Sequence, residues 1–144
     1  MKKNEDPIVV EQAFDVPAEK IWAAITEVDS MRRWFFEEIP DFRAEVGFET
    51  VFDISNEGRT FPHRWRVTSV RPLESISYDW SFDGYEGAGA ARFELLQIGD
   101  RNGVRVTFTT TEDFQDGIPE FERASGLAGW NYFIQDRLPQ FLNS

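Results

Sequence analysis

The sequence predicts an α+β fold in which an antiparallel sheet and the helices occupy separate parts of the chain. About six stretches of alternating apolar and polar residues follow one another in the middle of the sequence. A long amphipathic helical pattern comes only after the last of them. Runs of strands with segregated helices are typical of α+β domains with an antiparallel sheet. A length of 144 residues, 41% of them hydrophobic, suits a single domain over residues 1–144 with a substantial core.

The first elements are a strand and two helices. A strand is expected over Ile8–Asp15, because its apolar residues fall on one face. A helix follows, which Asp15 can cap and whose first turn suits Pro17. Its buried face is indicated by apolar residues at helical spacing: Ile21, Trp22, Ile25 and Val28. A second, short helix is expected over Ser30–Trp34.

The next segment is expected to begin the main series of strands. A loop over Phe35–Asp41 leads to two strands, Phe42–Val46 and Phe48–Ile54, with a break at Gly47. The sequence Asn56-Glu57-Gly58 then provides a hairpin turn.

The stretch Thr60–Trp80 is the most informative part of the chain. It predicts two strands separated by a turn over Arg71–Glu74, with one face built mainly from large rings: Phe61, His63, Trp65, Val67, Ile76, Tyr78 and Trp80. Trp, Tyr and His carry polar atoms that need partners when they are buried. A face of amphipathic rings therefore fits either a core or the wall of a small-molecule pocket. Two more strands are expected around Ala91–Leu95 and Val104–Thr110.

The last predicted element is a long helix over about Glu120–Leu142. Its apolar face is formed by residues three and four positions apart: Leu127, Trp130, Phe133, Ile134, Leu138 and Phe141. Pro139 lies inside this pattern, so the helix should kink or end near Leu138. A sheet of this size curls, and the helix can fill its concave side. The space between sheet and helix is a natural place for a cavity.

Composition and charge limit the classes of function. The net charge of −11 argues against binding to nucleic acids or anionic membrane surfaces. There is no cysteine, which excludes disulfides, thiol nucleophiles and thiolate metal sites. The charged start of the chain does not resemble a secretory signal, and no run of about 18 apolar residues indicates a membrane span. A cytoplasmic acidic protein, monomeric or homodimeric, is expected.

Several short motifs cover nearly the whole chain. They are Phe14–Thr26, Met31–Phe35, Gly47–Glu49, Val67–Trp80, Gly103–Phe108 and Gly129-Trp130. Together they resemble the single-domain proteins of the START-like (SRPBCC) superfamily. Within it, the most similar branch is related to the C-terminal domain of the activator of HSP-90 ATPase. These motifs are structural, so they indicate a fold more strongly than an activity.

The resemblance implies a helix-grip fold, in which a curved antiparallel sheet wraps around a long C-terminal α-helix. It also implies a hydrophobic cavity between sheet and helix, used across the superfamily for apolar ligands. This chain departs from the pattern at Trp65, where the fourth strand often carries a small residue, commonly Gly. A ring at this position is expected to shrink or reshape the cavity.

The candidate ligand-binding residues are side chains expected to face this cavity. They are Trp34, Phe52, Phe61, His63, Trp65, Tyr78, Trp80, Phe93, Phe108, Trp130 and Phe133. His63 is the only histidine. It can be a hydrogen-bonded structural residue, a group that orients a ligand or acts as a general base, or a metal ligand. It is accompanied by neither a Gly-x-Ser-x-Gly elbow nor a helical His/Glu spacing, so no catalytic residue, metal site or cofactor is predicted.

The sequence therefore favours a non-catalytic protein that binds a small apolar or aromatic ligand. Two alternatives stay open. One is a polyketide cyclase- or hydrolase-like enzyme that uses His63, with Tyr78, as acid and base. The other, suggested by the family resemblance, is a module that partners an HSP-90-type chaperone and stimulates its ATPase.

Overall fold

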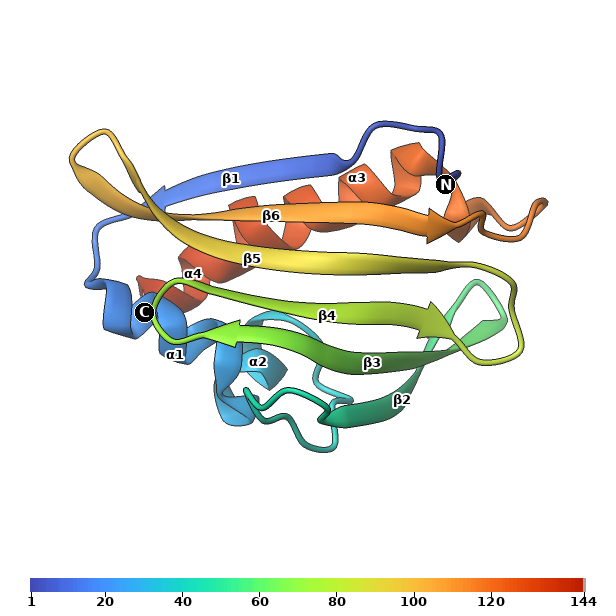
Figure 1. Cartoon of the computed structure of the whole chain (residues 1–144), viewed down its shortest axis with the longest axis horizontal. Helices are drawn as coiled ribbons and strands as arrows, with labels where there is room; N and C mark the ends of the chain where they lie inside the picture. The colour runs from blue at the N-terminus through green and yellow to red at the C-terminus, as the bar shows by residue number, and fades with distance from the viewer. Residues whose placement is uncertain (144) are drawn as a thin grey trace.

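The computed structural model describes residues 1–143, in which six strands form one antiparallel sheet (Figure 1). The strands are β1 (Ile8–Phe14), β2 (Glu49–Asn56), β3 (Arg59–Arg71), β4 (Ser75–Phe82), β5 (Ala88–Ile98) and β6 (Arg101–Glu112). Their order across the sheet is β1-β6-β5-β4-β3-β2. Every pair of neighbours except β1 and β6 is consecutive in the chain. The two helices after β1 lead to β2 at the opposite edge of the sheet, and the strands from β2 to β6 then return to the side of β1.

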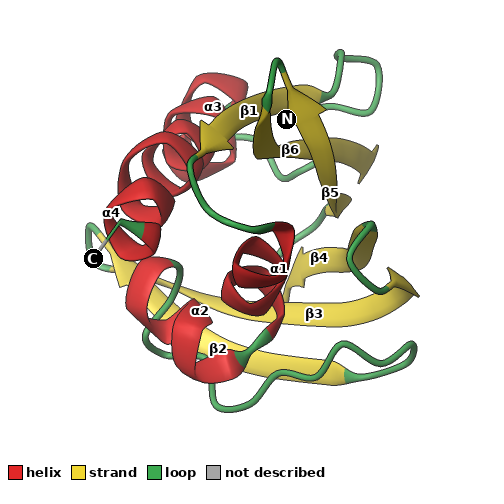
Figure 2. Cartoon of the chain, turned by 90° about the vertical axis from the view of Figure 1, so that its left-hand side faces the viewer, coloured by secondary structure: helices red, strands yellow, loops and turns green. Residues whose placement is uncertain are grey.

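The helices lie on the concave side and at one end of this curved sheet. The N-terminal pair is α1 (Ala18–Thr26) and α2 (Val28–Trp34). The C-terminal helix consists of α3 (Arg123–Asn131), the π-helical segment η2 (Tyr132–Arg137) and α4 (Leu138–Leu142), and the 3-10 turn η1 (Pro119–Phe121) precedes it. Figure 2 shows the sheet curling around the C-terminal helix, which is the helix-grip arrangement.

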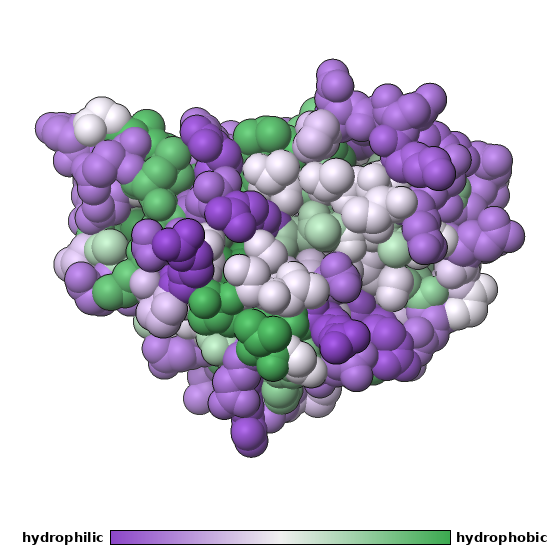
Figure 3. Space-filling model, viewed as in Figure 1, coloured by the Kyte–Doolittle hydropathy of each residue, from purple (hydrophilic) through white to green (hydrophobic). Residues whose placement is uncertain are grey.

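The predicted alternation over Thr60–Trp80 is confirmed. The side chains of one parity on β3 and β4 are buried, from Phe61 to Trp80, whereas Arg64 and Arg66 are exposed on the opposite face. Figure 3 shows the outer face of the sheet, where hydrophilic side chains and side chains of intermediate hydropathy predominate. The buried face therefore points toward the C-terminal helix.

The predicted strand over Phe42–Val46 is wrong. This segment is irregular, and regular pairing of β2 with β3 starts only at Glu49. Phe42 is nevertheless buried, and its ring meets those of Trp65 and Tyr78 edge-on. Phe42 is a loop residue whose side chain enters the core. The alternation of apolar and polar residues alone does not distinguish such a residue from a buried residue of a strand.

The helix boundaries also differ from the prediction. No side chain caps α1, and Asp15 instead accepts a hydrogen bond of 2.8 Å from Nε of Arg101 on β6. The second helix begins at Val28 rather than at Ser30.

The C-terminal helix starts later than predicted, and it does not end near Leu138. It begins at Arg123 rather than at Glu120, and it continues past Pro139 to Leu142. Proline lacks an N–H and crowds the carbonyl four residues earlier. The π-helical segment η2 directly before α4 widens the helix, which accommodates Pro139 within it.

The core is a continuous network of aromatic rings. Phe35, directly after α2, lies near its centre, with its ring centroid 4.7 Å from Trp34, 5.4 Å from Trp65 and 4.8 Å from Phe133. Contacts between aromatic rings stabilise the fold by more than the burial of their apolar area alone. Among residues 1–143, no helix is long and apolar enough to cross a membrane.

Candidate functional site

A cavity of about 430 Å³ lies between the sheet and the C-terminal helix. Its sheet wall is formed by side chains from β2, β3, β4 and β6: Ile54, Ser55, Asn56, Phe61, His63, Trp80, Phe82 and Phe108. Its other walls come from η1, the C-terminal helix, the loop after α2 and the N-terminus: Glu120, Phe121, Gly126, Gly129, Trp130, Tyr132, Phe133, Phe36 and Met1. This is an apolar, ring-rich surface with few polar groups, as small-molecule sites commonly have.

His63 is the polar side chain held deepest in this lining. The residue is only 6% exposed, and its ring lies among those of Phe36, Phe52, Trp80 and Phe82, with centroids between 4.7 and 5.6 Å away. Its Nδ1 is 2.9 Å from the carbonyl oxygen of Phe61. Burial lowers the pKa of His63 from 6.5 to about 4, so the imidazole is neutral near pH 7.

The candidate residues divide into two groups. Those that line the cavity are Phe61, His63, Trp80, Phe108, Trp130 and Phe133. Those that lie in the buried core and are not among the lining residues are Trp34, Phe52, Trp65, Tyr78 and Phe93. Trp65 is packed between the rings of Phe35, Phe42 and Phe52.

Two polar atoms of the core group have no hydrogen-bond partner among the described residues. They are Nε1 of Trp65 and the hydroxyl of Tyr78, which are sealed from solvent. Burial raises the pKa of Tyr78 well above its ordinary value. By contrast, Nε1 of the buried Trp34 donates to the carbonyl oxygen of Ala24 at 2.7 Å. Tyr78 is therefore walled off from the cavity and is not available to it as an acid.

Several lining residues were missed by sequence reasoning. Phe82 continues the alternation of Trp80 and lies two positions beyond the stretch Thr60–Trp80. Phe36 lies in the segment Phe35–Asp41, which was assigned to a loop and therefore not considered for the cavity wall. Gly129 was taken only as part of a structural motif, although a glycine on an inward helix face leaves space for a ligand.

Glu120 closes one end of the cavity by joining η1 to the β2–β3 hairpin. Its carboxylate accepts hydrogen bonds from Nε and Nη2 of Arg59, at 3.0 and 2.9 Å, and from Nδ2 of Asn56 at 2.7 Å. The Arg59 guanidinium holds the pKa of the Glu120 carboxyl below its ordinary value. We call these three residues the hairpin latch.

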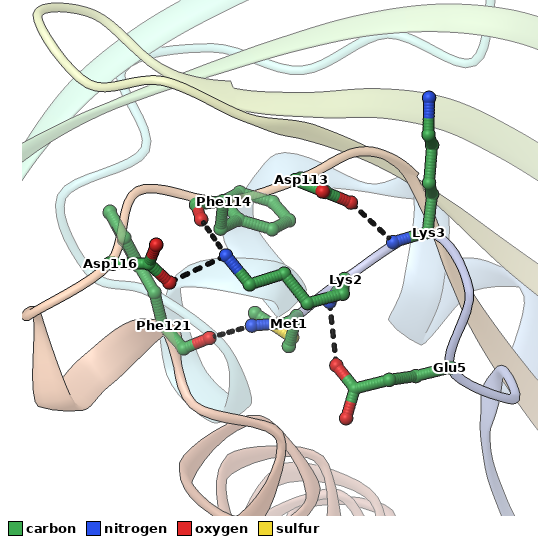
Figure 4. A network of polar contacts seen from close by, with 8 residues as sticks. All are labelled: Met1, Lys2, Lys3, Glu5, Asp113, Phe114, Asp116 and Phe121. Atoms are coloured by element: carbon green, nitrogen blue, oxygen red, sulfur yellow. Dashed lines mark hydrogen bonds and ion pairs between the residues drawn. The ribbon is translucent and has the colours of Figure 1, made fainter.

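The N-terminal residues cover another part of the same end (Figure 4). The amino group of Met1 donates to the carbonyl oxygen of Phe121, and the backbone N–H of Phe114 donates to the carbonyl of Met1 at 3.0 Å. Nζ of Lys2 donates to Asp116 at 2.6 Å and to the carbonyl oxygen of Phe114 at 3.1 Å. The first residues are thereby fixed against the segment that leads into α3.

Metal ligands are not gathered at this site. Within residues 1–143 no group of three or more His, Asp and Glu side chains is arranged to hold a metal ion. The cavity can thus offer ring surfaces and one neutral imidazole to a ligand.

Comparison with solved structures supports the fold assignment. DynU16, from the dynemicin biosynthetic locus, is 22% identical with a TM-score of 0.76, and the match covers 97% of this chain but 48% of DynU16. This chain therefore spans about half the length of that protein. MLL2253 from Mesorhizobium loti is 26% identical, with coverage of 95% and 96% and a TM-score of 0.71. The Aha1 dimer from Colwellia psychrerythraea is 19% identical, with coverage of 96% of each chain and a TM-score of 0.69.

Comparison with sequence families gives a family assignment. No curated protein matches the chain. The model of one family, described as Activator of Hsp90 ATPase homolog 1-like protein, matches residues 15–143. This match covers nearly the whole sequence, from the end of β1 to the last helical turn. The chain therefore belongs to the Activator of Hsp90 ATPase homolog 1-like protein family.

Proposed function

We propose that this protein binds a small apolar or aromatic molecule, without transforming it, in the cavity between the sheet and the C-terminal helix. The observation that carries the proposal is the lining itself: about 430 Å³ of space walled mainly by aromatic side chains from both layers. The rings that face this space lack packing partners on that side and forfeit dispersion contacts, which a ligand would restore. Ligand pockets have this size and this apolar character.

The chemistry of the lining favours binding over catalysis. His63 is hydrogen-bonded to a backbone carbonyl rather than to a carboxylate that would orient it and stabilise its cationic form. Its pKa of about 4 makes it a weak base at neutral pH. The hydroxyl of Tyr78 is sealed in the core. Neither group has the surroundings that an acid or base of a cyclase or hydrolase needs.

A cavity-filling variant tests the proposal. Gly129 lines the cavity, and a Cβ at this position would meet no heavy atom within 4 Å. Gly129→Leu should therefore place a side chain in the cavity while favouring the helix, since Gly is a poor helix former. The probe is N-phenyl-1-naphthylamine, an uncharged dye that fluoresces in apolar surroundings. Wild type should enhance its fluorescence with saturable binding, and Gly129→Leu should abolish the effect.

The matched control is Ala128→Leu, which adds the same side chain one position earlier on the exposed face of α3. It should bind the dye like wild type. Absence of dye binding by wild type, or equal binding by wild type and Gly129→Leu, would contradict the proposal. Native mass spectrometry of freshly purified protein, followed by extraction, would then identify any co-purifying small molecule.

A second candidate function is stimulation of a chaperone ATPase, which the family match over residues 15–143 favours. The measurement is ATP hydrolysis by the Hsp90-type chaperone of the same organism, with and without this protein. An unchanged rate over a range of protein concentrations would reject it. The cytoplasmic location and the monomeric or homodimeric state stay predictions alongside it.

A further inference from the structure

We propose that His63 selects the ligand, and that the cavity takes an uncharged aromatic molecule bearing a hydroxyl group whose O–H donates to Nε2 of His63. This inference rests on the proposed ligand-binding function of the same cavity, and it adds the ligand's chemical class. It is carried by the hydrogen bonding of the imidazole and by the charges around the cavity.

The tautomer of His63 follows from its partner. The carbonyl oxygen of Phe61 can only accept a hydrogen bond, so Nδ1, 2.9 Å away, must carry the hydrogen. In a neutral imidazole the other nitrogen is then an acceptor. His63 is neutral near pH 7 because burial lowers its pKa to about 4. Nε2 is therefore a lone-pair acceptor on a ring that lines the cavity.

Nothing in the surrounding wall satisfies this acceptor. Among residues 1–143 no group donates a hydrogen bond to Nε2, and the rings packed around the imidazole include only one with an N–H, that of Trp80. An acceptor in apolar surroundings costs free energy while it lacks a hydrogen bond, and a ligand that brings a donor removes this cost. A hydroxyl group on an aromatic molecule supplies that donor, while its rings stack on the lining.

The charges around the cavity argue against an anionic ligand. Among the described lining residues, two carry a charge: Glu120 on its carboxylate and Met1 on its amino group. Both charged groups are hydrogen-bonded to other residues of the protein. Within the part of the chain that the structure describes, neither Arg nor Lys lines the cavity. A carboxylate ligand would also approach a protein with a net charge of −11. An uncharged ligand needs no cationic partner in the lining and is not repelled by the net negative charge.

The experiment compares three ring-matched probes by isothermal titration calorimetry at pH 7. They are 2-naphthol, 2-methoxynaphthalene, which lacks the donor, and 2-naphthoate, which is anionic. Wild type should bind 2-naphthol about tenfold more tightly than 2-methoxynaphthalene, as expected for one hydrogen bond in an apolar site. It should bind 2-naphthoate most weakly.

Two variants assign this preference to His63. His63→Leu should bind 2-naphthol and 2-methoxynaphthalene equally, because it removes the acceptor. Phe133→Leu, which trims an apolar wall, should weaken both probes in parallel and preserve the ratio between them. Equal affinities of wild type for these two probes, or an unchanged ratio in His63→Leu, would overturn the inference and leave the proposed function standing. Failure of all three probes to bind would overturn both.

Nuclear magnetic resonance supplies a readout that needs no variant, since His63 is the only histidine. Long-range ¹H–¹⁵N spectra of the imidazole should show the Nδ1–H tautomer in free wild type. The Nε2 resonance should shift on addition of 2-naphthol and stay nearly unchanged with 2-methoxynaphthalene. An Nε2–H tautomer, or equal shifts with both probes, would overturn the inference even if His63→Leu fails to fold.

Discussion

At the scale of single residues, His63 links proton binding to folding. Four aromatic rings pack around its imidazole, and none of them is titratable in the physiological range. Burial therefore lowers its pKa from 6.5 to about 4, and the hydrogen bond to Phe61 only partly offsets this. Between these pH values the unfolded chain binds more protons than the folded one. The free energy of unfolding must then fall as the pH falls from about 6.5 toward 4.

This argument predicts how stability depends on pH. Between pH 7 and pH 5, protonation of His63 in the unfolded state should lower the free energy of unfolding by about 2 kcal/mol. His63→Leu lacks this contribution, whereas the carboxylates titrate alike in both proteins. Urea denaturation at several pH values should show the wild type losing more stability than the variant over this range. Parallel profiles for the two proteins would mean that the folded-state pKa is not depressed.

At the scale of elements, the end of the cavity is closed by contacts between segments that are far apart in sequence. The hairpin latch joins the tip of the β2–β3 hairpin to η1 through Asn56, Arg59 and Glu120. The carboxylate of Glu120 is mostly shielded, with 18% of its side chain exposed, and the guanidinium contacts both of its oxygens. Charge-assisted bidentate pairs of this kind fix geometry as well as adding energy.

Breaking the hairpin latch should loosen this end of the molecule without unfolding it. Glu120→Gln keeps the size of the side chain but removes its charge, so the contacts with Arg59 weaken. We expect faster amide hydrogen exchange in residues 54–60, with the exchange of β5 and β6 unchanged.

The control is Glu11→Gln, which breaks the Arg105–Glu11 pair of 2.6 Å between β1 and β6, away from the cavity. It should leave exchange in the β2–β3 hairpin at the wild-type rate. Equal exchange in this hairpin for wild type and both variants would show that the hairpin latch does not hold it in place.

The elements also show what the sequence could and could not predict. The β3 and β4 faces were predictable, because a strand in a half-buried sheet must alternate. Phe42 was wrongly assigned to a strand, because a loop ring that enters a core leaves no periodic signal of its own. The π-helical segment before Pro139 could not be predicted from the hydrophobic pattern either. The apolar residues of the helix recur at the same spacing before and after this segment.

The same limit applies to the cavity. The sequence could predict which rings face the C-terminal helix, yet Trp65 and Trp80 have the same parity on neighbouring strands and lie directly opposite each other. Trp65 is enclosed by loop rings, whereas Trp80 reaches the cavity wall. Which inward ring lines the cavity depends on where the loop after α2 packs against the sheet. That is a tertiary contact that strand periodicity does not encode.

At the scale of the whole molecule, the apolar interior divides into two parts. Around Phe35 the rings fill the space between sheet and helix, whereas between the hairpin latch and Trp130 they surround a cavity. The filled part supplies the packing that keeps the walls of the open part in place. A helix-grip chain with rings such as Trp65 in its core can thus still keep a cavity between sheet and helix.

The surface charge of the whole molecule works against this stability. The net charge of −11 comes from 26 acidic and 15 basic side chains, so the folded chain repels itself over long distances. Salt at about 100 mM shortens the screening length to about 10 Å, from about 30 Å at about 10 mM. The ion pairs join atoms within 4.0 Å and are screened less over this range than the long-range repulsion. Raising the salt concentration should therefore stabilise the protein, seen as a higher urea midpoint.

A charge-reversed variant makes this prediction specific. Glu45 and Asp53 are exposed, and each reversal to Lys changes the net charge by two, so Glu45→Lys with Asp53→Lys changes it from −11 to −7. The gain in urea midpoint between low and high salt should shrink in this variant, because less repulsion remains to be screened. A midpoint that falls with salt in the wild type would show that the surface ion pairs outweigh the net repulsion. A gain of equal size in both proteins would point to salt exclusion from the surface rather than to charge.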